Sequence, residues 1–267
     1  MNKSSIPDPE ADLLAYNRAA WNAQVHADNQ WTVAVSAAEI QRAREGDWSI
    51  VLTPHRSVPK EWFPDFSGDP CRVLCLAGSG GQQAPILAAA GASVTVFDLS
   101  EEQLKQDQLV AERDGLTIES VQGDMSDLSC FKDESFDLIV HPCSNSFVPN
   151  VLPVWQEAAR VLCRGGQLLA GFTKPVFYVF DQKRIEEGEL IVKHSIPYSD
   201  LTSISSVEKA KYIADQEPLC FGHSLSDQIG GQLEAGLRVI GYYEDHWKAY
   251  PVGKYIGDMA ATRAIKN

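Results

Sequence analysis

A run of small residues, Ala77-Gly78-Ser79-Gly80-Gly81, stands between an apolar segment and a helical segment that begins near Gln83. Glycines let the backbone turn tightly and approach a ligand closely, and a helix start offers free N–H groups to a carboxylate or phosphate. Asp98 ends the next apolar segment, 20 residues after Gly78. A carboxylate at that place can accept hydrogen bonds from both hydroxyls of a ribose. These features predict a site for a cofactor that contains a ribose.

The residue type at position 83 helps to distinguish between two classes of cofactor that such a turn can bind. The NAD-binding pattern G-x-G-x-x-G needs a third glycine at this position, and Gln83 occupies it. An NAD(P)-dependent oxidoreductase is therefore the less favoured alternative. A later strand end, Val121–Met125, again combines an acid, Asp124, with an apolar side chain, Met125, directly after Gly123.

The segments around these residues alternate between strand-like and helix-like patterns. Apolar runs typical of buried strands cover 72–77, 93–98, 117–123, 136–141 and 167–172. Helical patterns cover 83–90, 101–114 and 151–162. This alternation predicts an α/β fold with a doubly wound, mostly parallel sheet and helices on both faces. Such a sheet binds its ligands at the carboxyl edge of the strands.

Two strand-like segments near the C-terminus, 237–244 and 259–265, follow a helical segment at 224–235 and have no clear helix between them. They predict an antiparallel pair, with an antiparallel C-terminal strand at one edge of the sheet. Residues 1–69 are expected to form a helical N-terminal extension with an aromatic connecting segment. Residues 70–267 are expected to form the main domain, in which about 174–222 make a cap over the site.

The composition excludes several classes of protein. The 267 residues include 23 Lys and Arg against 36 Asp and Glu, a net charge of −13, which repels nucleic acid backbones. No apolar run reaches the roughly 18 residues that span a bilayer, and the N-terminus carries no export signal. The six cysteines lack a C-x-x-C pair, so they are expected to be reduced and to bind no zinc. We expect a cytoplasmic protein without a nucleic acid, membrane or metal partner.

A series of motifs resembles the class I S-adenosylmethionine-dependent methyltransferases. These motifs are the glycine turn, Val121–Met125, Phe136–His141 (FDLIVH), Ala159–Leu162 (ARVL) and Gly165–Leu169 (GGQLL), and the resemblance covers about residues 70–172. It implies a Rossmann-like fold and methyl transfer from S-adenosylmethionine to a small-molecule acceptor. A non-catalytic relative that only binds the cofactor is the alternative. More loosely, the chain looks like an uncharacterised bacterial group with a run of glycines followed by two glutamines.

The resemblance also implies which residues contact the cofactor. Asp98 would hold the ribose hydroxyls, and Asp124 would accept from the adenine amino group, although it is also suited to cap a turn. Leu99 and Met125 would cover the adenine faces. The full implied set is Ala77, Gly78, Ser79, Gly80, Gln83, Asp98, Leu99, Gly123, Asp124, Met125 and His141.

Two departures from the family pattern concern the methionine end of the cofactor. Cys75 stands where the family often has an acid that anchors the methionine ammonium group. The three glycine positions of the family turn fall on Ala77, Ser79 and Gly81, with glycines between them. Small residues still fill the whole turn, so backbone carbonyls of the turn are available as an alternative anchor.

The acceptor side has no obligatory motif, because methyl transfer from a sulfonium mainly needs a positioned nucleophile. His141 has two interpretations, a general base toward the acceptor or a strand-end residue that only positions the chain. Asn145 is expected to orient the acceptor or to form a turn, and His223 to reach the site or to lie on the surface. Tyr16 and Trp21 are expected to pack against the sheet or to cover the site. Aromatic lining favours a small organic acceptor.

Overall fold

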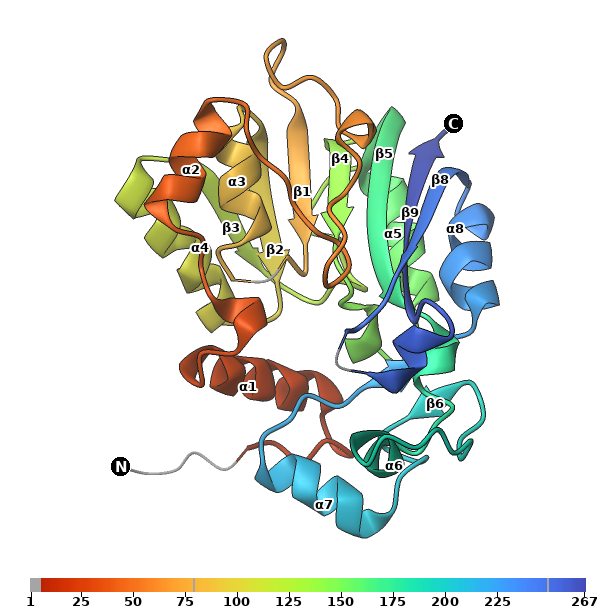
Figure 1. The fold of residues 1–267 in the computed structure, drawn as a ribbon. Helices are drawn as coiled ribbons and strands as arrows, with labels where there is room; N and C mark the ends of the chain where they lie inside the picture. The colour runs from red at the N-terminus through yellow and green to blue at the C-terminus, as the bar shows by residue number, and fades with distance from the viewer. Residues whose placement is uncertain (1–5, 79, 249) are drawn as a thin grey trace.

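The computed structural model describes residues 6–78, 80–248 and 250–267. Its centre is a seven-stranded sheet in the order β3-β2-β1-β4-β5-β9-β8 (Figure 1). The strands are β1 (Arg72–Leu76), β2 (Ser93–Asp98), β3 (Ile118–Gln122), β4 (Phe136–His141), β5 (Leu162–Thr173), β8 (Leu237–Asp245) and β9 (Met259–Lys266). β1 to β5 pair in parallel. The predicted doubly wound sheet is confirmed.

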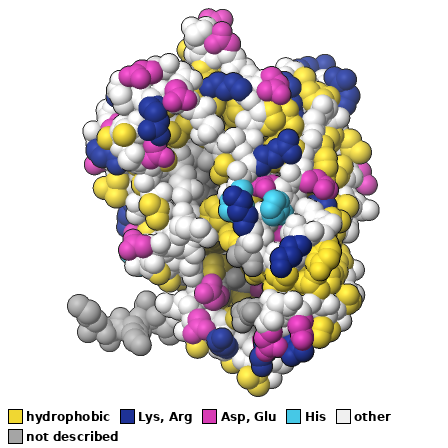
Figure 2. Space-filling view, viewed as in Figure 1, with side chains coloured by type: hydrophobic (Ala, Val, Ile, Leu, Met, Phe, Trp, Pro, Cys, Tyr) yellow, Lys and Arg dark blue, Asp and Glu magenta, His cyan; other side chains and the backbone are white. Residues whose placement is uncertain are grey.

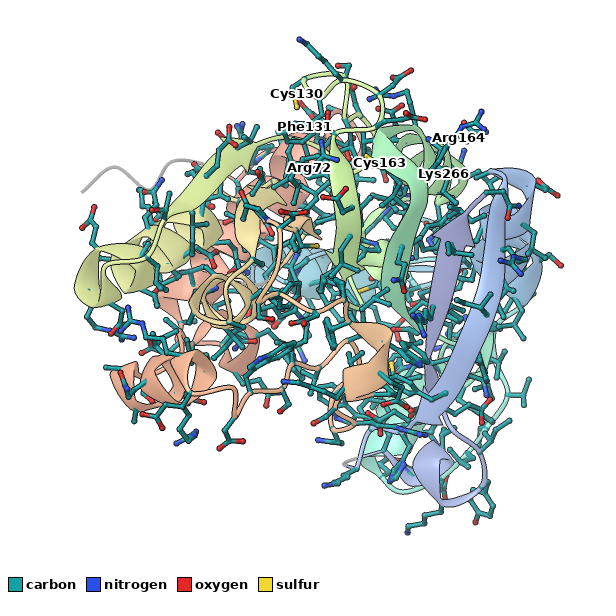
Figure 3. All side chains as sticks on the ribbon, turned by 90° about the horizontal axis from the view of Figure 1, so that it is seen from above. Arg72, Cys130, Phe131, Cys163, Arg164 and Lys266 are labelled. Atoms are coloured by element: carbon teal, nitrogen blue, oxygen red, sulfur yellow. The ribbon has the colours of Figure 1, made fainter. Side chains whose placement is uncertain are left out.

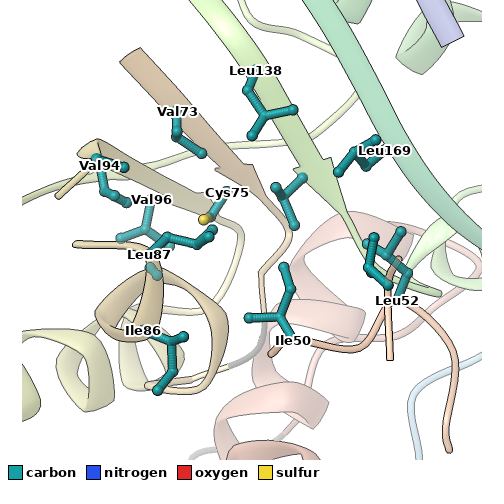
Figure 4. Packing of buried hydrophobic residues seen from close by; sticks show 14 of the residues in the cluster. Ile50, Leu52, Val73, Cys75, Ile86, Leu87, Val94, Val96, Leu138 and Leu169 are labelled. Atoms are coloured by element: carbon teal, nitrogen blue, oxygen red, sulfur yellow. The ribbon is translucent and has the colours of Figure 1, made fainter. Parts of the chain in front are cut away.

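Helices cover both faces of this sheet. α2 (Ala37–Arg44), α3 (Gln83–Ala89) and α4 (Glu101–Asp114) lie on one face, and α5 (Leu152–Val161) lies on the other. Side chains of β1 alternate between the two hydrophobic clusters, with Val73 in one and Leu74 in the other. Figure 4 shows the cluster that contains Val73, and Ile50 and Leu52 of the connecting segment belong to the same cluster. The aromatic connecting segment is therefore part of the core.

The C-terminal strands differ from their predicted arrangement in one respect. β8 and β9 pair antiparallel, as expected, and the short 3-10 helix Pro251–Lys254 joins them. β9 also pairs antiparallel with β5, so it lies between β5 and β8, and β8 forms the edge of the sheet. The antiparallel strand is thus second from the edge. The helical segment before β8 divides into a π-helical turn, Ser226–Gly230, and α8 (Gly231–Glu234).

The fifth strand also starts earlier than predicted. α5 ends at Val161 and β5 begins at Leu162, which pairs with Phe136 before the register shifts. Between Leu162 and Gln167 the strand is irregular, and Gly165 adopts a φ of 78° there. Glycine is suited to that left-handed conformation.

The first helix of the chain and the region 174–222 lie together below the carboxyl edge of the sheet (Figure 1). α1 (Leu13–His26) crosses this edge, and the second region contains α6 (Gln182–Glu186), β6 (Tyr198–Ser199), α7 (Ser206–Ala214) and β7 (Phe221–Gly222). The Tyr16 hydroxyl donates to the Glu217 carbonyl oxygen at 2.8 Å, and the Asn17 side chain bonds to both backbone groups of Leu219. These contacts join two segments that are about 200 residues apart in sequence.

At the amino ends of the parallel strands, an ion pair joins β1 to β4. Arg72 at the start of β1 contacts Asp137 of β4 at 2.8 Å, and Cys163 of β5 lies beside the pair (Figure 3). All six cysteines are free. Among the residues that the structure describes, none of the helices is long and apolar enough to cross a membrane, and no group of acidic, His and Cys side chains is arranged to hold a metal ion.

Candidate active site

A cavity of about 270 Å³ lies at the carboxyl edge of the parallel strands. Its walls include Ala77 after β1, Asp98 at the end of β2, Gly123 after β3, Pro142 after β4 and Thr173 at the end of β5. α1, the connecting segment at 51–54 and the chain after β5 complete the enclosure. In Figure 2 the surface is hollowed between the two lobes above α1, and basic side chains are scattered among acidic ones without forming a stripe.

Most of the expected cofactor residues line this cavity. They are Ala77, Gln83, Asp98, Leu99, Gly123, Asp124 and Met125. Gly78 and Gly80 belong to the turn but not to the lining, and Ser79 is outside the described residues. A Cβ atom at Gly80 would displace the Gln103 amide oxygen, so the turn passes close to α4. A Cβ atom at Gly123 would similarly collide with the Phe97 ring.

The two acids of the cavity differ in their bonding. One oxygen of Asp98 accepts from the Ser100 backbone N–H at 2.9 Å, and burial raises the pKa of this carboxyl to about 6. Asp124 accepts from the backbone N–H and the hydroxyl of Ser126, at 3.0 and 2.6 Å. Asp124 therefore caps a turn and also lines the cavity, so its two interpretations hold together.

Two buried amide oxygens of the lining have no hydrogen-bond partner among the residues that the structure describes. Gln83 donates its amide N–H to the Val51 carbonyl oxygen, but its Oε1 accepts nothing, and Oε1 of Gln103 on α4 is also unpaired. Both side chains are at most 5% exposed. A buried acceptor without a partner is unfavourable, and a ligand that donates hydrogen bonds would satisfy it. The cavity thus presents acceptors to a donor-rich ligand.

Asp107 on α4 lies under the glycine turn, and sequence reasoning missed it. It is buried, it accepts from the Gly81 backbone N–H, and its pKa is raised to about 8 by burial. Cys75 is fully buried nearby, and burial with the adjacent Asp107 raises the pKa of its thiol. Cys75 therefore stays neutral and does not replace the acid that the family often has there. A single acid within a helical pattern gave no signal for this placement.

His141 does not reach the cavity. Its ring is fully buried, with Nδ1 at 2.9 Å from the Leu76 carbonyl oxygen and Nε2 at 2.6 Å from the Asn145 amide. Burial lowers the pKa of the ring. Both ring nitrogens lie against oxygens that only accept hydrogen bonds, the Leu76 carbonyl oxygen and Asn145 Oδ1, so both are engaged inside the protein. The Asn145 amide nitrogen donates to the Gln228 amide oxygen, 3.0 Å away. This corrects the expectation of a general base, because neither ring nitrogen is available.

Three other residues that were expected to face the methyl acceptor form hydrogen bonds inside the protein instead. Asn145 is buried between His141 and Gln228, and the Nε2 atom of His223 contacts the Asn145 carbonyl oxygen at 3.0 Å. Tyr16 is fully buried, with its hydroxyl bonded to Glu217. These three are not among the lining residues. They hold the walls in place instead of facing an acceptor.

Trp21 does line the cavity, together with aromatic residues from other parts of the chain. Trp21 meets Phe147 edge to face with ring centroids 4.9 Å apart. Trp31 and Trp247 also face each other, with centroids 5.5 Å apart. Trp31 and Trp247 come from segments about 200 residues apart, so local sequence patterns do not predict their meeting.

Comparison with known protein families gives one matching domain. Residues 74–170 match the model of a methyltransferase domain. The chain is 54% identical over 254 residues to "Uncharacterized methyltransferase YbaJ" of Bacillus subtilis, which covers 95% of this chain and 98% of that protein. A sterol 24-C-methyltransferase of Gibberella zeae is 34% identical over 91 residues, covering 33% of this chain and 24% of that protein.

Solved structures give the same fold. An S-adenosylmethionine-dependent methyltransferase from Mesorhizobium loti superposes with a TM-score of 0.56 and 15% identity, covering 78% of this chain and 95% of that chain. A second such structure, from Listeria monocytogenes, has the same TM-score and identity and covers 78% and 94%.

Proposed function

The chain belongs to the S-adenosylmethionine-dependent methyltransferase family, and we propose that its acceptor is a small organic molecule held in the cavity at the carboxyl edge of the sheet. The observation that carries this proposal is the continuity of the cavity. Its lining includes Asp98 and Asp124 at the ends of β2 and β3 and, beyond β1 and β4 in the sheet, Thr173 at the end of β5. Ser146 and Tyr178 lie beside Thr173, and residues of α1 line the same cavity. An enclosed volume of about 270 Å³ suits a small molecule better than a macromolecular surface.

The residues present fit S-adenosylmethionine. Its ribose hydroxyls, adenine amino group and ammonium group are all donors, and the cavity offers unsatisfied acceptors. We assign the ribose to Asp98 and the adenine to Leu99, Asp124 and Met125. This assignment follows from their places directly at or after the ends of β2 and β3. Gln83 follows β1, and its unpaired Oε1 is the acceptor that we assign to the ammonium group.

The bound cofactor supplies a methyl group already activated on a positively charged sulfur. The chain's own residues then have two tasks, to hold the acceptor in line with that methyl group and to exclude water. We propose that α1 and residues 174–222 form the cap that does this, in keeping with the contacts of Tyr16 and Asn17 across it. A cytoplasmic location is also proposed, supported by the six free cysteines.

Transfer from labelled S-adenosylmethionine tests this function. With a bacterial metabolite extract, we expect S-adenosylhomocysteine and a labelled small molecule. With tRNA, rRNA or DNA we expect no label, because the net charge of −13 disfavours nucleic acid. Label on nucleic acid, with none on a small molecule, would contradict the proposal.

Cofactor affinity is expected to depend on pH. Burial raises the pKa of Asp98 to about 6, and only the ionised carboxylate accepts from both ribose hydroxyls. Affinity should therefore fall as the pH is lowered through about 6. Calorimetric titration from about pH 7.5 to about pH 5 measures this, and Asp98→Asn is the control that should show no such fall. A wild-type affinity that stays constant over the range would rule out Asp98 as the ribose ligand.

A further inference from the structure

Three buried hydroxyl groups meet in the part of the cavity remote from Asp98 and Asp124. The Tyr178 hydroxyl donates to Ser146 Oγ at 2.8 Å, and Ser146 Oγ donates to Thr173 Oγ1 at 3.3 Å. All three side chains are less than 8% exposed and line the cavity. The Thr173 hydroxyl is also hydrogen-bonded to Tyr178, so the protons of the cluster are engaged within it. Several oxygen lone pairs therefore remain to accept a hydrogen bond from a ligand.

The position of this hydroxyl cluster (Ser146, Thr173 and Tyr178) is fixed by packing. The Tyr178 ring stacks on Tyr198 with centroids 5.2 Å apart. On another side it lies so close to Gly222 that any Cβ there would collide with the ring. A residue held from two sides offers its hydroxyl at a defined place, which suits recognition of one ligand atom.

Charge is missing around the hydroxyl cluster. Among the described residues that line the cavity, Asp98 and Asp124 are the only ones of Asp, Glu, His, Lys or Arg type. Lys174, next to Thr173 in sequence, does not line the cavity, and its ammonium group pairs with Glu244 at 2.6 Å. A carboxylate or phosphate in this part of the cavity would lose its hydration without gaining a cation, which is strongly unfavourable.

The titratable side chains of the described lining beside the cluster are neutral. Burial raises the pKa of the Cys143 and Cys220 thiols and of the Tyr178 hydroxyl, so none of them can take a proton from an acceptor near neutral pH. Asp200 does not line the cavity and accepts from the Tyr198 hydroxyl and the Cys220 backbone N–H. Asp98 and Asp124 line the cavity at the ends of β2 and β3, away from the end of β5. The lining beside the cluster therefore offers no base to an alcohol or a carbon acid.

Aromatic rings make up much of the remaining wall. Trp21, Phe147, Trp31 and Trp247 form two contacting pairs, and Phe177 packs on Tyr178 with centroids 5.2 Å apart. Such walls favour an apolar molecule. Their faces also attract a positive charge that develops on a ligand.

Building on the proposed function, we propose that the acceptor is an uncharged, mainly apolar amine or nitrogen heterocycle, oriented by the hydroxyl cluster of Ser146, Thr173 and Tyr178. Its nitrogen lone pair forms the new bond to the methyl carbon while the carbon–sulfur bond breaks and its electron pair stays on sulfur. The nitrogen becomes cationic beside the aromatic walls, and any proton that it carries passes to water after release. No base from the chain is needed.

Binding of matched probes tests the selectivity without relying on turnover. Aniline and benzoate have one ring each and differ in charge at neutral pH. Ligand-observed NMR on the protein saturated with S-adenosylhomocysteine should show saturable aniline binding that is at least about tenfold tighter than benzoate binding. Equal binding of the two probes, or no binding of aniline, would overturn the proposal.

Variants test the hydroxyl cluster. Tyr178→Phe and Thr173→Val should each weaken aniline binding severalfold and leave the affinity for S-adenosylhomocysteine unchanged. Tyr255→Phe, at a tyrosine that is 79% exposed, is the matched control and should change neither. If both cluster variants bind aniline as the wild type does, the cluster does not orient the acceptor.

The methylated atom gives a second readout. After incubation with S-adenosylmethionine labelled with 13C on its methyl group and a metabolite extract, the carbon chemical shift identifies the bonded atom. We expect an N-methyl product. An O-methyl or C-methyl product would overturn the acceptor assignment alone, whereas the absence of any labelled product would contradict the proposed function on which it rests.

Discussion

Asp98→Ala is expected to weaken binding of S-adenosylmethionine by roughly 1.5–3 kcal/mol, or about ten- to a hundredfold. The carboxylate lies in the cavity at the end of β2, and hydrogen bonds to an ionised group are the strongest that a ribose can form there. Isothermal titration calorimetry measures the change.

Two controls separate this effect from damage to the fold. Asp47→Ala removes an acid whose side chain is 84% exposed, and its affinity should equal that of the wild type. The Asp98→Ala variant should keep its cooperative thermal unfolding. An unchanged dissociation constant in a folded Asp98→Ala variant would mean that the ribose is held elsewhere.

His141→Ala is expected to destabilise the protein by about 2–4 kcal/mol. The substitution leaves the Leu76 oxygen and the Asn145 amide without their partner and opens a void beside Trp155, whose ring meets the imidazole edge to face. Denaturant unfolding measures the loss. His26→Ala, at an exposed histidine, should stay within about 0.5 kcal/mol of the wild type.

The same histidine predicts a direction for the pH dependence of stability. Burial lowers its pKa in the folded state below the ordinary value of 6.5. The unfolded chain then binds a proton that the folded chain does not, so the contribution of His141 to stability falls as the pH drops through about 6.5. His141→Gln should reduce that fall and retain turnover in its folded fraction. Loss of turnover in folded His141→Gln would restore the general-base role.

The sheet could be predicted from the sequence because each parallel strand carries its own signal. The runs ending at Asp98 and His141 are mainly apolar, as is typical of strands covered on both faces. The start of β5 could not be predicted in this way, since Leu162 pairs with Phe136 and regular pairing resumes only at Gln167. The place of β9 between β5 and β8 likewise depends on pairing over about 90 residues of sequence.

The two ends of the cavity differ in how far the sequence predicts them. Asp98, Asp124 and Met125 follow strand ends directly, so their place at the carboxyl edge follows from topology. The hydroxyl cluster comes from two separate segments, and no local pattern joins Ser146 to Thr173 and Tyr178. The sequence left two roles open for His141, because a polar residue at a strand end looks the same in sequence whether it faces a ligand or, as here, pairs with Leu76 and Asn145.

The most direct test of this account is a calorimetric titration of the purified protein with S-adenosylmethionine and, separately, with NAD. The acids at the ends of β2 and β3, the unpaired oxygens of Gln83 and Gln103 and the absence of a third turn glycine at position 83 all favour the first ligand. We expect one saturable site for S-adenosylmethionine that S-adenosylhomocysteine competes for, and no measurable NAD binding. Tight binding of NAD with no response to S-adenosylmethionine would contradict the account.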